Sequence, residues 1–310
     1  MSVTTPAPPA PRQSPPTMTV QSGRIRGWLR PRSGFSLLTP RAAVSAVVST
    51  LAGRLGLACA AVVAVLIAAG SLRSATPSAV AIQDAFRGPS WAHPLGTDDY
   101  GRDELARVAA GGRTSLFAAV LVLAIAMAVA LLVGTLSGLL GGFVDAVLMR
   151  ITDVVLSIPS LVLAMAVIGT LGPGFMQLVG ALSVSYIASF TRMSRAFALA
   201  SRNRPDVAAA RLAGVGWWRT TIGHVLPRVA SQLCVISTLT LGDIVISIAG
   251  LSFLGLGIQP PAAEWGSMLS DSRSAFSVQP WLLVGPAMAI VLTAGAVNLI
   301  ADAVRERVPA

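Results

Sequence analysis

The stretch LFAAVLVLAIAMAVALLVGTLSGLL, from Leu116 to Leu140, decides the fold class because it contains no charged residue. An α-helix needs about 20 consecutive apolar residues to cross the hydrocarbon core of a bilayer, and this stretch is long enough. Within it, Gly134 and Gly138 are spaced to let a second helix approach closely. The sequence therefore predicts a transmembrane helix here, packed against another helix.

The whole chain has the same apolar character. Of its 310 residues, 54% are hydrophobic and 12% are charged, and the mean hydropathy is +0.73. A soluble domain usually carries about 25% charged residues, so this chain is short of polar side chains to cover a soluble surface. We predict an all-α polytopic membrane protein with six transmembrane helices. The expected spans are Leu51–Gly70, Leu116–Leu140, Val154–Leu171, Leu178–Ala198, Val229–Gly250 and Trp281–Ile300.

Arginine positions indicate how these spans are oriented. The sequence has a net charge of +10 and no lysine, and its arginines gather in the N-terminal tail, between the fourth and fifth spans, and at the C-terminus. Because arginine is enriched on the cytoplasmic side, six spans place all three segments there, with both termini inside. Arginines spread over loops do not form a basic soluble face, so no nucleic-acid partner is expected.

The first 41 residues differ from the rest. Residues 1–41 are rich in Pro, Ser and Arg and contain no acidic residue. Such a composition cannot bury enough apolar surface to offset the entropy of ordering, so it indicates a disordered, cationic cytoplasmic tail. The remaining residues, 42–310, form the predicted transmembrane domain.

A segment of about residues 199–228 separates the fourth and fifth spans and is too polar and glycine-rich to cross a bilayer. Pro205 suits the first position of a helix, and Asp206 beside it complements the positive end of that helix. The three alanines at 208–210 favour a helix that another surface can approach closely. Gly214 is expected to end that helix. We predict a docking helix outside the lipid; an ordinary connecting loop is the alternative. The candidate docking residues are Asp206, Ala208, Ala209, Ala210, Gly214, Gly216, His224, Leu226 and Pro227.

The spacing of residues 208–210, Gly214 and Leu226-Pro227 resembles the cytoplasmic coupling loop of ABC importer permeases. Ala208 stands where that family has Glu, and His224-Val-Leu-Pro is similar to the His-Ile-Leu-Pro of the peptide-importer branch. Four further stretches resemble the same branch in order: HPLGTDDYGRDELARVAAGGRTSL (93–116), GLLGGFVDAVLMRITDVVLSIPSLVLA (138–164), LSFLGLGIQPPAAEWGSMLSDSR (251–273) and PWLLVGPAMAIVLTAGAVNLIADAVR (280–305).

This resemblance covers roughly residues 51–307 and points to the C-type permeases of dipeptide, oligopeptide and nickel importers. It implies a type I ABC importer permease fold and location in a bacterial cytoplasmic (inner) membrane. The implied solutes are dipeptides or oligopeptides; nickel chelates and glutathione-like solutes are the alternatives. The implied partners are a homologous second permease, two ABC ATPase subunits and an extracytoplasmic substrate-binding protein. The resemblance implies no cofactor on this chain, because ATP and Mg²⁺ are used by the ATPase subunits.

Acidic residues near or within the spans are candidate functional residues because a carboxylate facing lipid costs several kcal/mol. Asp153 lies near the cytoplasmic boundary and is expected to pair with Arg150. Asp243 lies deeper in the fifth span. The candidate residues of the translocation path are Asp243, Ser247, Met165 and Ser157. Two loops on the outer side combine turn-forming residues and acids with aromatic residues, a pattern that loop folding alone explains. The resemblance implies that these loops also face the substrate-binding protein, through Asp98, Asp99, Arg102, Asp103, Glu264 and Trp265.

The sequence disfavours other function classes. Without lysine there is no GxxxxGK[ST] phosphate loop, so the chain cannot hydrolyse ATP by that route. A membrane enzyme would need a nucleophile with a base or a metal cluster. His93 and His224 fall on opposite sides in this topology, and neither an HExxH nor a GxSxG motif is present. We therefore predict a non-enzymatic permease without a metal site, in preference to a membrane enzyme or a membrane scaffold.

Overall fold

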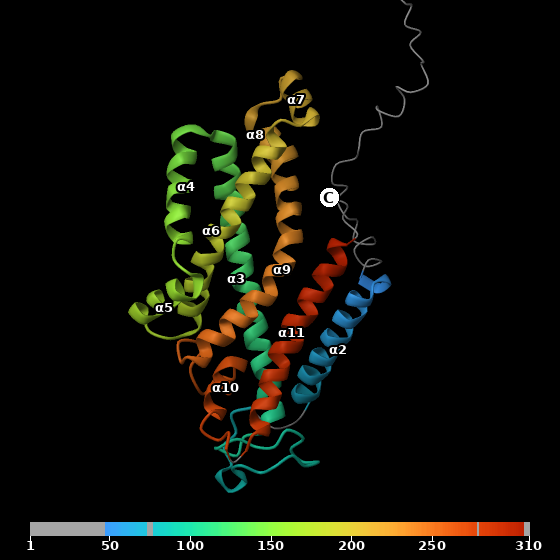
Figure 1. The fold of residues 1–310 in the computed structure, drawn as a ribbon, viewed down its shortest axis with the longest axis vertical. Helices are drawn as coiled ribbons and strands as arrows, with labels where there is room; N and C mark the ends of the chain where they lie inside the picture. The colour runs from blue at the N-terminus through green and yellow to red at the C-terminus, as the bar shows by residue number, and fades with distance from the viewer. Residues whose placement is uncertain (1–46, 73–76, 278, 307–310) are drawn as a thin grey trace, which may run out of the picture. The chain divides into compact units, whose positions relative to one another are not determined.

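Helices make up the named elements of the computed structural model, which describes residues 47–72, 77–277 and 279–306 (Figure 1). In those ranges the β-type pairing consists of an isolated antiparallel β-bridge between Thr97 and Asp103. The predicted all-α class is confirmed. The predicted tail, residues 1–41, lies outside the described residues.

Within the described ranges, five helices are long, and seven short helical elements connect or cover them. The long helices are α2 (Leu51–Leu72), α3 (Glu104–Leu140), α6 (Phe175–Arg202), α9 (Leu226–Phe253) and α11 (Trp281–Arg305). The short elements are η2 (Ile82–Asp84), α4 (Gly142–Leu156), α5 (Ser160–Leu171), α7 (Pro205–Leu212), α8 (Trp217–Thr220), the π-helical turn η3 (Thr221–Val225) and α10 (Trp265–Ser272). In Figure 1, α7 and α8 lie at one end of the long helices, and α10 and the loop of residues 77–103 lie at the other. We call these the α7 end and the α10 end.

Four helices in the part of the chain that the structure describes are long and apolar enough to cross a membrane: α2, α3, the continuous helical stretch Trp217–Phe253, and α11. The bent pair of α4 and α5 is a fifth if it forms one span. The expected fourth span, α6, is not among them, because its 28 residues include Arg192, Arg195 and Arg202 together with several hydroxyl side chains. A polytopic helical membrane protein is thus established, and the count of six spans stays a prediction.

The third span is broken, and the prediction of one helix over Val154–Leu171 is wrong. Helix α4 begins earlier, at Gly142, and ends at Leu156, and α5 then departs at an angle of 87°. Pro159 stands at the start of α5. Proline has no N–H to donate and disfavours helical geometry in the residue before it, so the helix stops at this point.

Two glycines let α3 and α6 pack closely, as the spacing of Gly134 and Gly138 predicted. A Cβ on Gly134 would lie 2.5 Å from the backbone oxygen of Thr191, and one on Gly138 would lie 2.9 Å from that of Arg195. On the same helix, Ala118, Ala126 and Ala130 have no exposed surface in this chain. Small side chains therefore form the core between these helices, as is usual where lipid supplies no hydrophobic driving force.

Ion pairs fix α4 to α6. Arg195 makes two hydrogen bonds to the carboxylate of Asp145, at 2.5 and 2.6 Å, and Arg192 contacts Asp153 at 2.5 Å. The predicted partner of Asp153, Arg150, is therefore wrong. A neighbour one turn away on the same helix was the expected choice, but the antiparallel packing of α4 on α6 brings Arg192 to Asp153 instead.

The close α3–α6 contact predicts opposite effects for two identical substitutions. Glycine to alanine favours a helix by up to about 1 kcal/mol, and Gly180 of α6, with open space around it, should show this gain. Gly134→Ala should instead lower the thermal midpoint of the purified chain in detergent, because overpacking costs about 1–3 kcal/mol. An equal rise in the midpoint for both variants would contradict the close contact.

Candidate functional site

The candidate site at the α7 end is a short helix followed by a tight bend. Pro205 occupies the first turn of α7, as predicted. The helix ends at Leu212. Gly214, two residues further on, has a φ of +78°, which residues other than glycine rarely adopt. Two backbone hydrogen bonds close the bend, from Gly214 N to Arg211 O and from Val215 N to Ala210 O, both at 3.0 Å. Gly216 then caps α8 with an ordinary φ of −60°.

The chain continues from this bend into a long helix. Helices α8 and α9 are joined by η3, and His224 lies exposed within that π-helical turn. Leu226 and Pro227 form the first turn of α9, where the missing N–H of proline is tolerated. Pro227 therefore lies at the start of α9.

One face of α7 is buried and another is exposed. Val207 has no exposed surface and belongs to a buried cluster with Leu139, Ala198, Val225 and Val229. Ala208 and Ala209 are exposed, and Ala210 is partly exposed. Helix α7 is therefore held to the bundle by its apolar side chain, while its alanines leave backbone accessible for another surface to approach.

Large apolar side chains are also exposed around this bend. Leu212 is 89% exposed, Trp218 is 63% exposed and Ile222 is 59% exposed. The ring of Trp218 contacts that of Trp217 edge-on, with centroids 4.6 Å apart. Exposed apolar side chains concentrated on a polar segment are typical of a protein interaction site.

Asp206 is the acidic group of α7. Its carboxylate contacts Arg204 at 3.3 Å and Arg228, in the first turns of α9, at 3.1 Å. Partial burial raises the pKa of Asp206, but its backbone hydrogen bond and the two arginines outweigh that effect, so the net pKa lies below the ordinary value. The sequence singled out Asp206 as a helix-end residue and missed Arg228; the available signal was a cation directly after Leu-Pro.

The predicted path residues lie on exposed parts of α9, α4 and α5. Asp243 shares an exposed face of α9 with Ile246 and Gly250. Ser247 donates a hydrogen bond to Asp243 O at 2.8 Å. Met165 is 40% exposed on α5. Ser157, just after α4, is exposed and donates to Val154 O at 2.7 Å. Among the described residues, no hydrogen bond or ion pair joins Met165 or Ser157 to Asp243, so their common role stays a prediction.

At the α10 end, most of the predicted binding-protein residues instead hold the loop together. Asp98 accepts hydrogen bonds from the backbone N of Tyr100 and of Arg102, both at 2.9 Å, and from Arg102 Nε at 2.6 Å. Asp103 caps α3 by accepting from Ala106 N, and its other oxygen lies 2.9 Å from His93 Nδ1. These acids satisfy the backbone of a folded loop, which was the alternative interpretation.

Glu264 and Trp265 cannot present their side chains to a partner, because neither has exposed surface; their expected outward orientation is corrected here. Glu264 caps α10 by accepting from Ser267 N at 3.0 Å, and it accepts from Ser115 of α3 at 2.8 Å. Trp265 donates to Val108 O at 2.9 Å and lies against Gly111 and Gly112 of α3. An acid beside an aromatic residue is typical of a surface loop, which explains why the prediction is wrong. The sequence signal for burial is the pair of adjacent glycines in α3, which leave room for the ring of Trp265.

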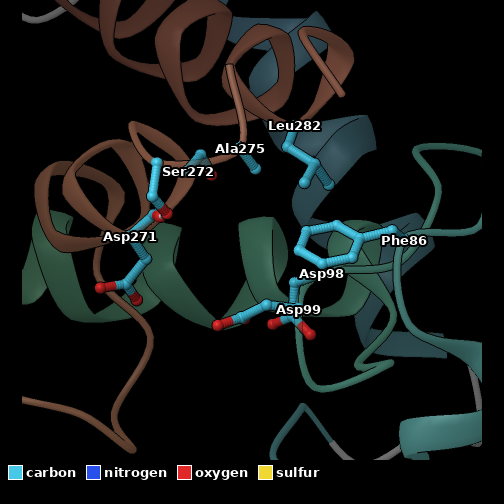
Figure 2. Close-up of a pocket in the computed structure, with 8 residues that line it drawn as sticks. Phe86, Asp98, Asp99, Asp271, Ser272, Ala275 and Leu282 are labelled. Carbon is cyan, nitrogen blue, oxygen red and sulfur yellow. The ribbon is translucent and has the colours of Figure 1, made fainter. Parts of the chain in front are cut away.

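Asp99 keeps an exposed side chain in this region (Figure 2). It lines a small pocket together with Phe86, Asp98, Asp271, Ser272, Ser274, Ala275 and Leu282. Burial and the neighbouring Asp98 raise the pKa of Asp99, and burial also raises that of Asp271, although Arg102 and Arg107 partly offset both shifts. The described residues contain no group of three or more His, Cys, Asp or Glu side chains placed to hold a metal ion.

The fold and this site define a class: a multi-pass helical membrane protein with a short exposed helix–bend–helix segment outside its spans. Residues 130–309 match a protein family described as the binding-protein-dependent transport system inner membrane component, and the chain belongs to this family. Its relatives are transport permeases, so the chain is a permease subunit and not an enzyme. The family works with ATPase and substrate-binding partners and implies location in the inner membrane.

Three relatives illustrate the range of solutes in this family. A probable D,D-dipeptide transport system permease of Escherichia coli (strain K12) is 37% identical, over 74% of this chain and 77% of the relative. A glutathione transport system permease of Shigella flexneri serotype 5b (strain 8401) is 42% identical, over 71% and 72%. A nickel transport system permease of Escherichia coli (strain K12) is 34% identical, over 74% and 83%. The chain is therefore an ABC importer permease of the dipeptide, glutathione and nickel class.

The burial of Glu264 leads to a test of its structural role. Glu264→Ala removes the acceptor for Ser115 and Ser267, and each buried group left unsatisfied costs about 1–3 kcal/mol. We expect a clear fall in the thermal midpoint of the detergent-purified chain. Asp99→Ala, which removes an exposed carboxylate from the same region, should leave the midpoint nearly unchanged. Equal midpoints for the two variants would show that Glu264 does not hold α10 on α3.

Proposed function

We propose that this chain is the C-type permease subunit of a bacterial importer for dipeptides or oligopeptides. It forms the translocation path with a second, homologous permease, and separate ATPase subunits drive it. The observation that carries this proposal is the α7 segment: a helix with exposed Ala208, Ala209 and Leu212, then a bend at Gly214, and after the bend the exposed side chains of Trp218 and Ile222. Such a surface outside the spans suits a protein partner that presses on it.

Peptides are favoured over nickel chelates by the chemistry of the named relatives. D,D-dipeptides and glutathione both consist of amide-linked amino acids, whereas nickel does not. The sequence His224-Val-Leu-Pro, similar to that of the peptide-importer branch, supports the same choice. Nickel chelates and glutathione-like solutes are the alternatives that an uptake assay separates.

In the proposed mechanism, a displacement of α7 moves α9. When the ATPase subunits close on ATP, they displace α7, and the buried contact of Val207 with Val225 and Val229 passes this displacement to the start of α9. Helix α9 carries the exposed Asp243, so its movement changes access to the path between the permeases. Ala208 replaces the Glu found in the family, so contact with the ATPase rests on shape and apolar surface at that position.

The arginine-rich segments support an orientation with both termini and α7 in the cytoplasm. The α10 end then faces outward, where a substrate-binding protein delivers the solute. In that arrangement Asp99, which stays exposed, is the acidic side chain proposed to face the binding protein.

Charge or bulk on α7 should uncouple transport without affecting insertion. In a strain lacking the native importer, Gly214→Glu and Ala209→Asp should reduce dipeptide uptake to the level of the deletion strain, because they hold the ATPase away from α7. Membrane yield and ATPase co-purification are measured on the same cells. Gly214→Asn is the matched control, since asparagine tolerates a positive φ without adding charge.

Retained uptake in Gly214→Glu, with normal membrane yield, would contradict the coupling role of α7. Wild-type uptake of nickel in place of dipeptide would contradict the peptide assignment while leaving the coupling role intact. Uptake of glutathione without uptake of dipeptide would show that the solute is glutathione and not a dipeptide.

The orientation predicts which side of the membrane each end faces. The two native thiols, Cys59 and Cys234, are free and are first replaced by alanine. In intact cells, a membrane-impermeant maleimide should label Asp99→Cys and should label Arg211→Cys only after the membrane is opened. Labelling of Arg211→Cys in intact cells would overturn the proposed topology.

A further inference from the structure

An ion pair connects the two helical stretches that meet at the α7 end. The carboxylate of Asp206, in the first turn of α7, lies 3.1 Å from a guanidinium nitrogen of Arg228, in the first turn of α9. The other carboxylate oxygen lies 3.3 Å from Arg204. The side chains of Asp206 and Arg228 are 39% and 31% exposed, so the pair is partly shielded from water.

The apolar residues next in sequence reinforce this contact. Val207 follows Asp206, Val229 follows Arg228, and both valines are fully buried in one cluster. Two consecutive residues of α7, one charged and one apolar, therefore lie beside two consecutive residues of α9, one charged and one apolar. The two helices are therefore held in a defined register by polar and apolar contacts together.

The backbone alone does not fix this register. From Trp217 to Phe253 the chain is one continuous helical stretch, so α8, η3 and α9 are joined directly. Between α7 and that stretch lie Ala213 to Gly216, and Gly214 has nothing within 4 Å of where its Cβ would be. Backbone hydrogen bonds and Thr220 Oγ1, which donates to Gly216 O at 3.2 Å, close the bend locally. The contacts of Asp206 and Val207 add the direct connection between α7 and α9.

The guanidinium of Arg228 is partly buried. One of its terminal nitrogens, Nη1, is buried without a hydrogen-bond partner, as is Oε1 of Gln232 one turn later. A guanidinium that is partly withdrawn from water depends more strongly on its anionic partner. Removing the charge of Asp206 therefore weakens the position of Arg228 itself as well as the contact between the helices.

We propose that Asp206 and Arg228 are positioning residues that lock α7 to α9, so that a displacement of α7 reaches the stretch bearing Asp243 as a rigid movement. This inference rests on the proposed coupling function of α7 and adds the device that transmits the movement. Neither residue is required to touch solute or nucleotide. Loss of the lock lets α7 move with the ATPase while α9 stays in place.

The test is the stoichiometry of the complete complex. This chain, the second permease, the ATPases and the binding protein are reconstituted in proteoliposomes, and ATP hydrolysed per peptide transported is measured. Asp206→Asn and Arg228→Gln should each raise this ratio about twofold or more, an effect in keeping with the modest energy of a partly exposed ion pair. Chain yield should stay normal in both variants, and ATPase retention should stay normal in Arg228→Gln, which lies outside the candidate docking residues.

Two sets of variants separate the lock from a general effect of charge. The exchange of both residues, Asp206→Arg with Arg228→Asp, should bring the ratio back toward the wild-type value. The matched controls are Asp84→Asn and Arg87→Gln, which break an ion pair of 2.7 Å in the loop of residues 77–103 and should leave the ratio unchanged.

Wild-type ratios in both single variants would overturn the lock, and so would an exchange variant that is as uncoupled as the single ones. If the single variants do not accumulate in the membrane, the ratio of ATP hydrolysed to peptide transported is measured for the exchange variant alone. A ratio twofold or more above the wild-type value would then overturn the lock. Failure of the underlying coupling function is a different result: the wild-type complex would then retain no ATPase or show no peptide-stimulated hydrolysis.

Discussion

A bilayer offers no water to replace a broken backbone hydrogen bond, and this constraint governs how the chain can work. Its spans can change position as intact helices but cannot partly unfold within the lipid. Movement must therefore begin at an element outside the lipid and pass into a helix that crosses it. In the mechanism we propose, that element is α7, and Val207, Asp206 and Arg228 connect it to the receiving helix, α9.

The rest of the fold keeps the other helices from absorbing that movement. Gly134 and Gly138 bring α3 against α6 so closely that backbone atoms meet. Arg192 and Arg195 fix α4 to the same helix. At the α10 end, Glu264 and Trp265 hold α10 on α3. Helices α3, α4 and α6 thus form one firmly connected group, with α10 attached to it.

The sequence predicted the features that depend on local pattern. Apolar length located most spans, glycine spacing predicted the α3–α6 contact, and proline and glycine located the ends of α7. Features that depend on which helices become neighbours could not be predicted. The partner of Asp153 is Arg192 and not Arg150 because α4 lies antiparallel on α6. Glu264 is buried because α10 folds back onto α3, and no local pattern encodes that return.

The central claim is that α7 and α9 move as one body, and a distance measurement tests it most directly. Spin labels at Leu212→Cys, just before the bend, and at the exposed native Cys234 of α9, with Cys59 replaced by alanine, report the distance between the two helices. The account predicts the same distance distribution in the assembled transporter without nucleotide and with trapped ATP, while the sample remains active in transport. A shift or broadening of that distribution on ATP binding would contradict it.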